Sequence, residues 1–237
     1  MTNKPQHLIQ AKALTRTYAQ KNRPPVKALD NVDLEVAKGE FLAVVGRSGS
    51  GKTTLLNLIG ALDRPTAGKI FFDGKNMSDF SNRDLAIFRR EKIGFVFQTF
   101  NLLPALTVKE NILVALVKTK LPKTEINRKI LELLSFFELA DKADRLPLEL
   151  SVGQQQKAAL ARALIKDPTV ILADEPTGEM DPIAGKEIME KLEELNKKSG
   201  VTLIVASHGI AVQRKADRTV FLNAGRIDSS GRYEGYY

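Results

Sequence analysis

The chain has 237 residues, contains no cysteine and carries a formal net charge of +8. The lack of cysteine excludes disulfides and thiolate metal sites. The longest apolar run, Ile112 to Val117, is far shorter than the ~20 residues that cross a bilayer, and the N-terminal segment has no apolar signal core. We therefore expect any membrane role to depend on a partner.

The charge is unevenly distributed along the chain. It is +9 in residues 1–120 and −1 in residues 121–237. An anionic ligand of the first half and a solvated basic surface explain this asymmetry equally well, so charge alone does not assign a function.

In chain order, the first structural signals are short apolar runs that alternate with helical stretches. Such runs favour a buried, mostly parallel sheet. The runs are Phe41–Val45, Ile93–Phe97, Thr169–Ala173 and Thr202–Ser207. The N-terminal part instead shows alternating polarity in residues 27–36 and glycine-bearing turns in residues 68–77, which favours a small antiparallel sheet at one edge.

The middle of the chain has a mainly helical pattern, in residues 107–117 and 123–139. We therefore predict an α/β fold with a mostly parallel sheet, an N-terminal antiparallel β subdomain and an inserted α-helical subdomain. The predicted organisation is one domain over residues 1–237. Residues 1–98 and 158–237 form its core, and residues 99–157 form the helical subdomain.

The first chemical motif, Gly46–Thr54 (GRSGSGKTT), directly follows the predicted strand Phe41–Val45. It fits the G-x-x-x-x-G-K-[ST] phosphate loop, whose glycines let successive backbone N–H groups face an anion. Lys52 is expected to reach the β- and γ-phosphates, and the Thr53 hydroxyl to bind Mg²⁺. The predicted nucleotide-binding residues of this loop are Gly46, Arg47, Ser48, Gly49, Ser50, Gly51, Lys52, Thr53 and Thr54.

The second motif ends an apolar run with two carboxylates, Asp174 and Glu175, before Pro176. Adjacent strand residues point to opposite sides, so the two acids need different roles. Asp174 suits a Mg²⁺ ligand, and Glu175 suits the base that orients and deprotonates the water attacking the γ-phosphate. Together with the phosphate loop, these acids predict a P-loop nucleotide-binding core rather than a solvated acidic loop.

A third stretch, Glu149–Leu164 (ELSVGQQQKAALARAL), begins a helix with a very polar start. Ser151 and Gln154 have the spacing of a capping box, so one interpretation is a well-capped helix. A capped start also offers its N–H groups and a hydroxyl to an anion. One phosphate loop already supplies what one ATP needs, so a second such site has no evident ligand within this chain.

With these three motifs the chain resembles the ATP-binding cassette (ABC) ATPases, whose LSGGQ signature corresponds to LSVGQ, Leu150–Gln154. The resemblance implies a head-to-tail dimer with two bound Mg-ATP molecules. Ser151, Gly153 and Gln154 of one subunit would complete the ATP site of the other. Val152 replaces the family's usual glycine, and a β-branched residue restricts the backbone there.

Four further residues match this family one at a time. By the resemblance, Gln98 senses Mg²⁺ and the γ-phosphate, Asp181 lies at the dimer interface, and His208 contacts the γ-phosphate. Tyr18, 28 residues before the phosphate loop, would stack on adenine. The other histidine, His7, is expected in an N-terminal tail. The implied catalytic residues are Lys52, Gln98, Glu175 and His208, and the implied magnesium ligands are Thr53, Gln98 and Asp174.

A narrower resemblance is visible in residues 55–77 and 96–116. They are similar to the cassettes of lipoprotein-releasing and macrolide- or peptide-exporting systems. This resemblance implies a second copy of the chain and integral-membrane permease subunits as partners, no nucleic acid, and a place at the cytoplasmic face of the inner membrane. It also implies that exposed apolar residues around Phe100 to Pro104 receive a helix of the permease.

Three other function classes are alternatives to a transporter ATPase. A nucleotide kinase or GTPase has no use for LSVGQ, and the chain has no NKxD motif. A DNA-repair or translation cassette protein would carry two cassettes or a long coiled coil. A cell-division cassette, which regulates a periplasmic process without transport, would look much the same and remains the alternative.

Overall fold

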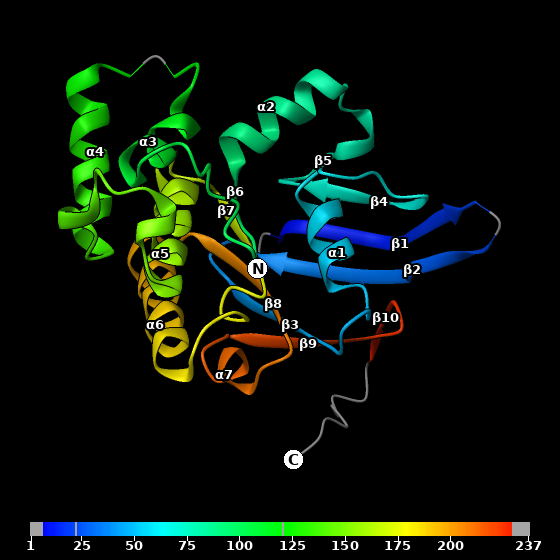
Figure 1. Cartoon of the computed structure of the whole chain (residues 1–237). Helices are drawn as coiled ribbons and strands as arrows, with labels where there is room; N and C mark the ends of the chain where they lie inside the picture. Colours follow the sequence, from blue (N-terminus) through cyan, green and yellow to red (C-terminus); the bar gives the residue numbers. More distant parts are fainter. Residues whose placement is uncertain (1–6, 22, 120, 229–237) are drawn as a thin grey trace, which may run out of the picture.

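A six-stranded sheet forms the centre of the fold, and a four-stranded antiparallel sheet lies beside it (Figure 1). This computed structural model describes residues 7–21, 23–119 and 121–228. The strands are β1 (His7–Gln20), β2 (Arg23–Ala37), β3 (Phe41–Val45), β4 (Ala67–Phe72), β5 (Lys75–Asn76), β6 (Ile93–Val96), β7 (Val170–Asp174), β8 (Thr202–Ser207), β9 (Arg218–Asn223) and β10 (Arg226–Asp228). The α-helices are α1 (Lys52–Ile59), α2 (Asn82–Lys92), α3 (Val108–Leu113), α4 (Lys123–Phe136), α5 (Val152–Leu164), α6 (Pro182–Ser199) and α7 (Ile210–Gln213).

The six-stranded sheet has the order β10-β9-β3-β8-β7-β6, and only the β9–β10 pair is antiparallel. Its inner strands are apolar on both faces because each face is covered. In β3, Leu42 and Val44 pack into the core that contains α1, whereas Phe41, Ala43 and Val45 pack into the core that contains α5 and α6. The predicted α/β class with its mostly parallel sheet is therefore confirmed.

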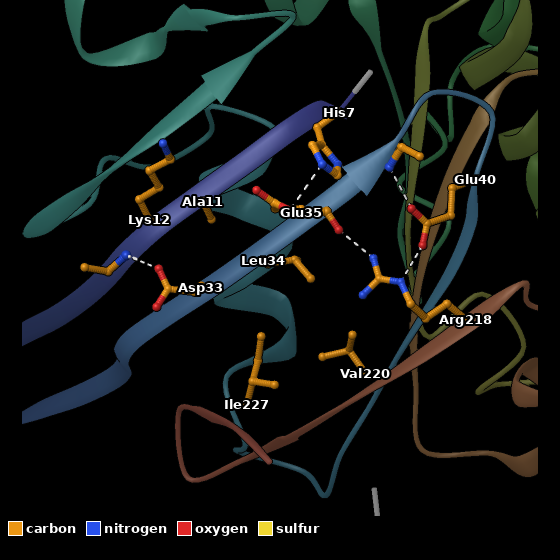
Figure 2. A pocket seen from close by; sticks show the side chains of 12 residues that line it. His7, Ala11, Lys12, Asp33, Leu34, Glu35, Glu40, Arg218, Val220 and Ile227 are labelled. Atoms are coloured by element: carbon orange, nitrogen blue, oxygen red, sulfur yellow. Dashed lines mark hydrogen bonds and ion pairs between the residues drawn. The ribbon is translucent and has the colours of Figure 1, made fainter. Parts of the chain in front are cut away.

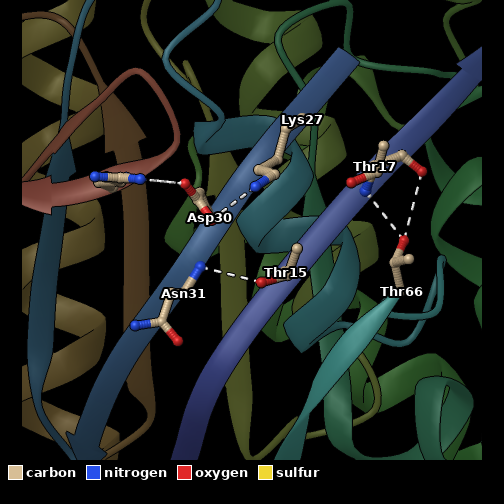
Figure 3. Close-up of polar contacts among 7 residues, drawn as sticks. Thr15, Thr17, Lys27, Asp30, Asn31 and Thr66 are labelled. Carbon is tan, nitrogen blue, oxygen red and sulfur yellow. Dashed lines mark hydrogen bonds and ion pairs between the residues drawn. The ribbon is translucent and has the colours of Figure 1, made fainter. Parts of the chain in front are cut away.

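The antiparallel sheet, of order β2-β1-β4-β5, covers α1 from the outside. The pairing of β1 with β2 has several register shifts, and side chains hold the backbone where they occur (Figure 3). Thr15 Oγ1 accepts a hydrogen bond from the N–H of Asn31, a residue with φ of 53°. Thr66 Oγ1 accepts one from the N–H of Thr17. The predicted antiparallel N-terminal sheet is thus confirmed, with side-chain bonds compensating for the irregular ladder.

A hollow of about 680 Å³ lies between the two sheets (Figure 2). Arg218 of β9 crosses it, donating from Nε to Glu40 Oε1 at 2.7 Å and from Nη2 to the backbone oxygen of Glu35 at 2.5 Å. His7 lies 3.2 Å from Glu35 at its edge. His7 is therefore part of β1, and its predicted place in a tail was wrong because His7 pairs with Ala37 of β2. None of the predicted nucleotide-binding residues lines this hollow.

The helical lobe, which is the predicted helical subdomain and contains α3 and α4, packs on the face of the large sheet that α5 covers (Figure 1). The α3 helix begins after a capping box formed by Thr107 and Glu110, and α4 begins at Lys123, where the sequence predicts a helix start. The proposed subdomain limit at residue 157 falls within α5. In the described part of the chain, no helix combines the length and the apolarity that crossing a membrane requires.

Asn111 fixes the loop that leads into this lobe. Its side chain is fully buried; Oδ1 accepts from the N–H of Leu103 at 2.8 Å, and Nδ2 donates to the carbonyls of Leu103, Leu106 and Thr107 at 2.9–3.1 Å. Leu103 itself remains 45% exposed. Because the buried Asn111 side chain supplies hydrogen-bond partners for its backbone groups, the loop can expose apolar side chains to solvent.

We expect Asn111→Ala to lower the free energy of unfolding by about 3 kcal/mol, because it leaves several backbone groups without a partner. Urea denaturation followed by circular dichroism measures the loss. Asn127→Ala is the matched control, since Asn127 is an exposed residue of α4 in the same lobe. Equal stability of the two variants would contradict the role assigned to Asn111.

Candidate active site

The predicted site residues come together because four parallel strands end at the same edge of the sheet. Val45 of β3 pairs with Ser207 of β8, Asp174 of β7 pairs with Ala206, and Val96 of β6 pairs with Ala173. The phosphate loop, the two acids, His208 and Gln98 each follow one of these strand ends. Ligands of open α/β sheets bind at this carboxyl edge.

The phosphate loop needs glycine at two positions for different reasons. Gly51 has φ of +105°, and a Cβ on it would lie 2.4 Å from the carbonyl oxygen of Ala28 in β2. Gly46 has an ordinary φ, but its Cβ would lie 2.3 Å from the carbonyl oxygen of Leu222 in β9. The loop is thus pressed against both sheets, and α1 starts directly after it. Its N–H groups and the N-terminus of α1 suit an anion.

Lys52 is a nearly buried cation, 7% exposed. Its Nζ donates to the carbonyl oxygens of Gly46 at 2.8 Å and Arg47 at 3.2 Å. It also lies 3.3 Å from Oε1 of Glu175. The ammonium is therefore satisfied by the loop that would hold the phosphates and by the predicted base.

Glu175 connects this lysine to His208. Its Oε2 lies 3.0 Å from His208 Nδ1 and accepts a hydrogen bond from the His208 backbone N–H at 3.3 Å. The Glu175 side chain is only 13% exposed, whereas that of His208 is 66% exposed. Glu175 also has φ of 46°, an uncommon backbone conformation that a hydrogen bond from its N–H to the carbonyl of Ala206 holds in place. Three of the predicted catalytic residues thus form one connected cluster.

Asp174 has the environment of a metal ligand. Its Oδ1 is buried and has no hydrogen-bond partner in the described structure. Burial raises the pKa of this carboxyl above its usual range, and the charge of Glu175 adds to the shift, whereas a hydrogen bond from Thr53 and the charge of Lys52 oppose it. A cation beside Oδ1 would supply the missing partner. Because Mg²⁺ takes few protein oxygens and completes its octahedron with phosphates and water, Asp174 and Thr53 fit it.

Gln98, the third predicted magnesium ligand, lies in a loop held from two sides. Its Nε2 donates to Glu179 Oε1 at 2.7 Å. Two and three residues farther on, Phe100 and Asn101 both have positive φ, and the Arg162 guanidinium of α5 binds their carbonyl oxygens at 2.7 and 2.5 Å. Sequence reasoning assigned no role to Glu179 or Arg162, because neither contact follows from a motif or a spacing.

The polar start of α5 has a double structural role. Ser151 Oγ accepts from the N–H of Gln154, and Gln154 Oε1 accepts from the N–H of Ser151, so the predicted capping box is present. Gln156 is fully buried and donates to the carbonyl oxygen of Pro176 at 2.8 Å. Gln156 therefore ties the signature helix to the loop after Glu175, a contact that the run of three glutamines did not reveal.

Gly153 has no steric reason to be glycine within the chain. A Cβ on it would meet only Ala184 Cβ, at an ordinary 3.6 Å. Glycine near a helix start lowers helix stability. A residue with this cost and no internal need suits a surface that another molecule approaches closely.

Two predicted residues are engaged elsewhere. Asp181 caps α6 by accepting from the N–H groups of Ile183 and Ala184. Tyr18 donates to Asp63 at 2.8 Å, and the Arg16 guanidinium lies over its ring at 4.5 Å from the centroid. These contacts stabilise β1 and the start of α6, and the structure brings neither side chain into the Lys52–Glu175–His208 cluster.

Comparisons with known proteins place the chain in a family. Residues 29–178 match the ABC transporter family. An uncharacterised ABC transporter ATP-binding protein of Methanocaldococcus jannaschii, MJ0796, is 41% identical over 233 residues, which cover 97% of this chain and 99% of that protein. The solved dimer of MJ0796 in a post-hydrolysis state bound to ADP and Pi has a TM-score of 0.87 at 40% identity, and the match covers 96% of this chain and 100% of that one.

Relatives with named cargo point in two directions. The macrolide export ATP-binding/permease protein MacB of Nitrosomonas europaea is 41% identical over 93% of this chain and 33% of its own length. The methionine import ATP-binding protein MetN of Francisella tularensis is also 41% identical, over 95% of this chain and 64% of its own length. The phosphate loop, the acidic pair and these matches together identify the chain as a member of the ABC transporter ATP-binding proteins, which are ATPases.

Proposed function

We propose that this chain is the Mg-ATP-hydrolysing subunit of a transporter whose integral-membrane permease subunits it binds at the cytoplasmic face of the membrane. Two copies bind two ATP molecules head to tail, and their closure drives the permease. The proposed outcome is export, lipoprotein release or mechanotransmission. Resemblance to exporting cassettes and the MacB match support export, and the MetN match supports import at the same identity. The cell-division alternative gains no support from these relatives.

The observation that carries this proposal is the cluster of contacts between Lys52, Glu175 and His208. Beside it lies Asp174, whose buried Oδ1 has no hydrogen-bond partner in the described structure. When a γ-phosphate takes the place of Glu175 at Lys52, the carboxylate is released from the ammonium and becomes available to the attacking water. Glu175 then accepts a proton from the attacking water, and His208 holds the γ-phosphate side of the cluster. Thr53, Asp174 and Gln98 would hold Mg²⁺, which supplies charge neutralisation on the phosphates.

The partner site for the permease is proposed on the loop braced by Asn111. Leu103, Pro104 and Ala105 are exposed there, and Leu113 and Val114 of the adjoining helical segment are 41% and 37% exposed. Such a group of apolar side chains on a lobe with satisfied backbone suits an amphipathic helix of a membrane subunit.

Glu175→Gln should slow ATP hydrolysis by about 10²–10⁴-fold, because it removes the proposed base, and should trap an ATP-dependent dimer. Sedimentation velocity with and without Mg-ATP measures the dimer. Adding Ser151→Arg should abolish it, because the bulky cation stands where the neighbour's phosphate is expected.

The matched control for that substitution is Ser81→Arg in the same Glu175→Gln chain. Ser81 forms an equivalent capping box at the start of α2, so it reports the cost of losing a cap alone. ATP-dependent dimers that survive Ser151→Arg as well as Ser81→Arg would rule out a composite site at the signature helix.

Asp174→Asn should stabilise the nucleotide-free protein at neutral pH while it weakens Mg-ATP binding. The pKa of Asp174 is raised in the folded state by burial, so its charged form costs stability. That cost is absent below the ordinary pKa of aspartate and grows as pH rises through the raised pKa. Thermal unfolding from acid to neutral pH checks the sign. A lower melting temperature for Asp174→Asn at pH 7 would contradict it.

A further inference from the structure

One hydrogen bond in the site joins loops from two different strands. Gln98 follows β6, and Glu179 lies in the loop that leads from β7 to α6. Gln98 Nε2 donates to Glu179 Oε1 at 2.7 Å. Among the residues that the structure describes, neither side chain has another hydrogen bond or ion pair. Each of these two groups is therefore oriented by the other.

This bond selects one of the two orientations of the Gln98 amide. A carboxylate only accepts hydrogen bonds, whereas a primary amide has a donor end and an acceptor end. Rotating the amide by half a turn would place its oxygen against the oxygens of Glu179, and both groups would then lack a donor. With Nε2 turned to Glu179, the Gln98 oxygen remains for another ligand, and oxygen is the atom that Mg²⁺ prefers.

We propose that Glu179 is a positioning residue that fixes the amide of Gln98 so that its oxygen is presented to the nucleotide-bound Mg²⁺. The inference rests on the proposed function, in which Gln98 is a magnesium ligand. It adds an acid to this site that acts through Gln98 and touches neither the metal nor the nucleotide. Groups that orient metal ligands in this way contribute strongly to metal affinity.

The surrounding backbone gives this contact its precision. The N–H of Gly178 donates to the carbonyl of Glu175 at 3.0 Å, forming a turn that sets the start of the Glu179 loop. A Cβ on Gly178 would lie 3.4 Å from Gln98 Nε2, so the loop passes directly beside the amide. On the other side, Arg162 binds the carbonyls of Phe100 and Asn101. Gln98 thus lies between two segments whose backbones are held by hydrogen bonds, and Glu179 determines only the rotation of its side-chain amide.

A bond between an amide and a carboxylate can act through orientation or through charge. Glu179 is the third acid of this region, after Asp174 and Glu175, and it adds a negative potential that would attract any divalent cation. The Gln98→Ala background separates the two effects, because a loss of charge weakens Mg²⁺ binding there too, whereas a loss of orientation requires the glutamine. If orientation matters, Glu179→Ala has no further effect in that background.

The test is isothermal titration calorimetry of ATP binding to the Glu175→Gln protein, once with excess Mg²⁺ and once with excess EDTA. We expect Glu179→Ala to weaken Mg-ATP binding about tenfold and metal-free ATP binding less than about twofold. Glu190→Ala is the matched control, since Glu190 is an exposed acid of α6 whose Oε1 lies 3.8 Å from Lys186 Nζ.

Gln98→Ala supplies the second arm. In that background, Glu179→Ala should cause no further loss of Mg-ATP affinity, because the group through which it acts is gone. Equal weakening of both forms of ATP, or an additive loss in the Gln98→Ala background, would each overturn the inference. Failure of the parent protein to bind ATP in either condition would instead refute the proposed function, and the inference with it.

Discussion

The arrangement of the site depends on one constraint, the need to satisfy the nearly buried charge of Lys52. An unpaired ammonium at 7% exposure would be costly. The chain meets the need with two carbonyls of the phosphate loop and with Glu175. These groups come from the ends of β3 and β7, so the lysine connects the loop that binds phosphate to the acid that activates water. The predicted base is thereby paired, and the loop is closed around the Lys52 ammonium.

Three of the eleven non-glycine residues with positive φ in the described structure lie in the loops that follow β6 and β7. Glu175, Phe100 and Asn101 have positive φ although none is glycine. In each case a hydrogen bond offsets the strain: the Glu175 N–H donates to Ala206, and Arg162 binds the carbonyls of Phe100 and Asn101. Because such conformations persist only where the surroundings hold them, the loops after β6 and β7 are set by α5 and β8 as much as by their own sequence.

Sequence patterns predict the parts of this fold where local and global preferences agree. The limits of β3 and β8 match the predicted apolar runs, because both strands are buried on both faces and no polar residue interrupts them. The strand β1 was not predicted, because its polar and apolar residues do not alternate regularly. The register shifts in its pairing with β2 account for this irregular pattern. The phosphate loop and the acidic pair were likewise readable from spacing. The contacts of Gln156, Arg162 and Glu179 join residues far apart in the chain, and no local pattern encodes them.

The local geometry at the start of α5 accommodates Val152, which replaces the usual glycine of the signature. A β-branched residue restricts the backbone, which suggested a cost at Val152. Val152 is the first residue of α5, directly after the Ser151 cap, and its φ is not positive. A helical backbone is compatible with valine, whose side chain has one preferred rotamer there. Val152 is 42% exposed, so its effect on the chain itself is small, and any consequence lies at the surface that the neighbouring subunit would meet.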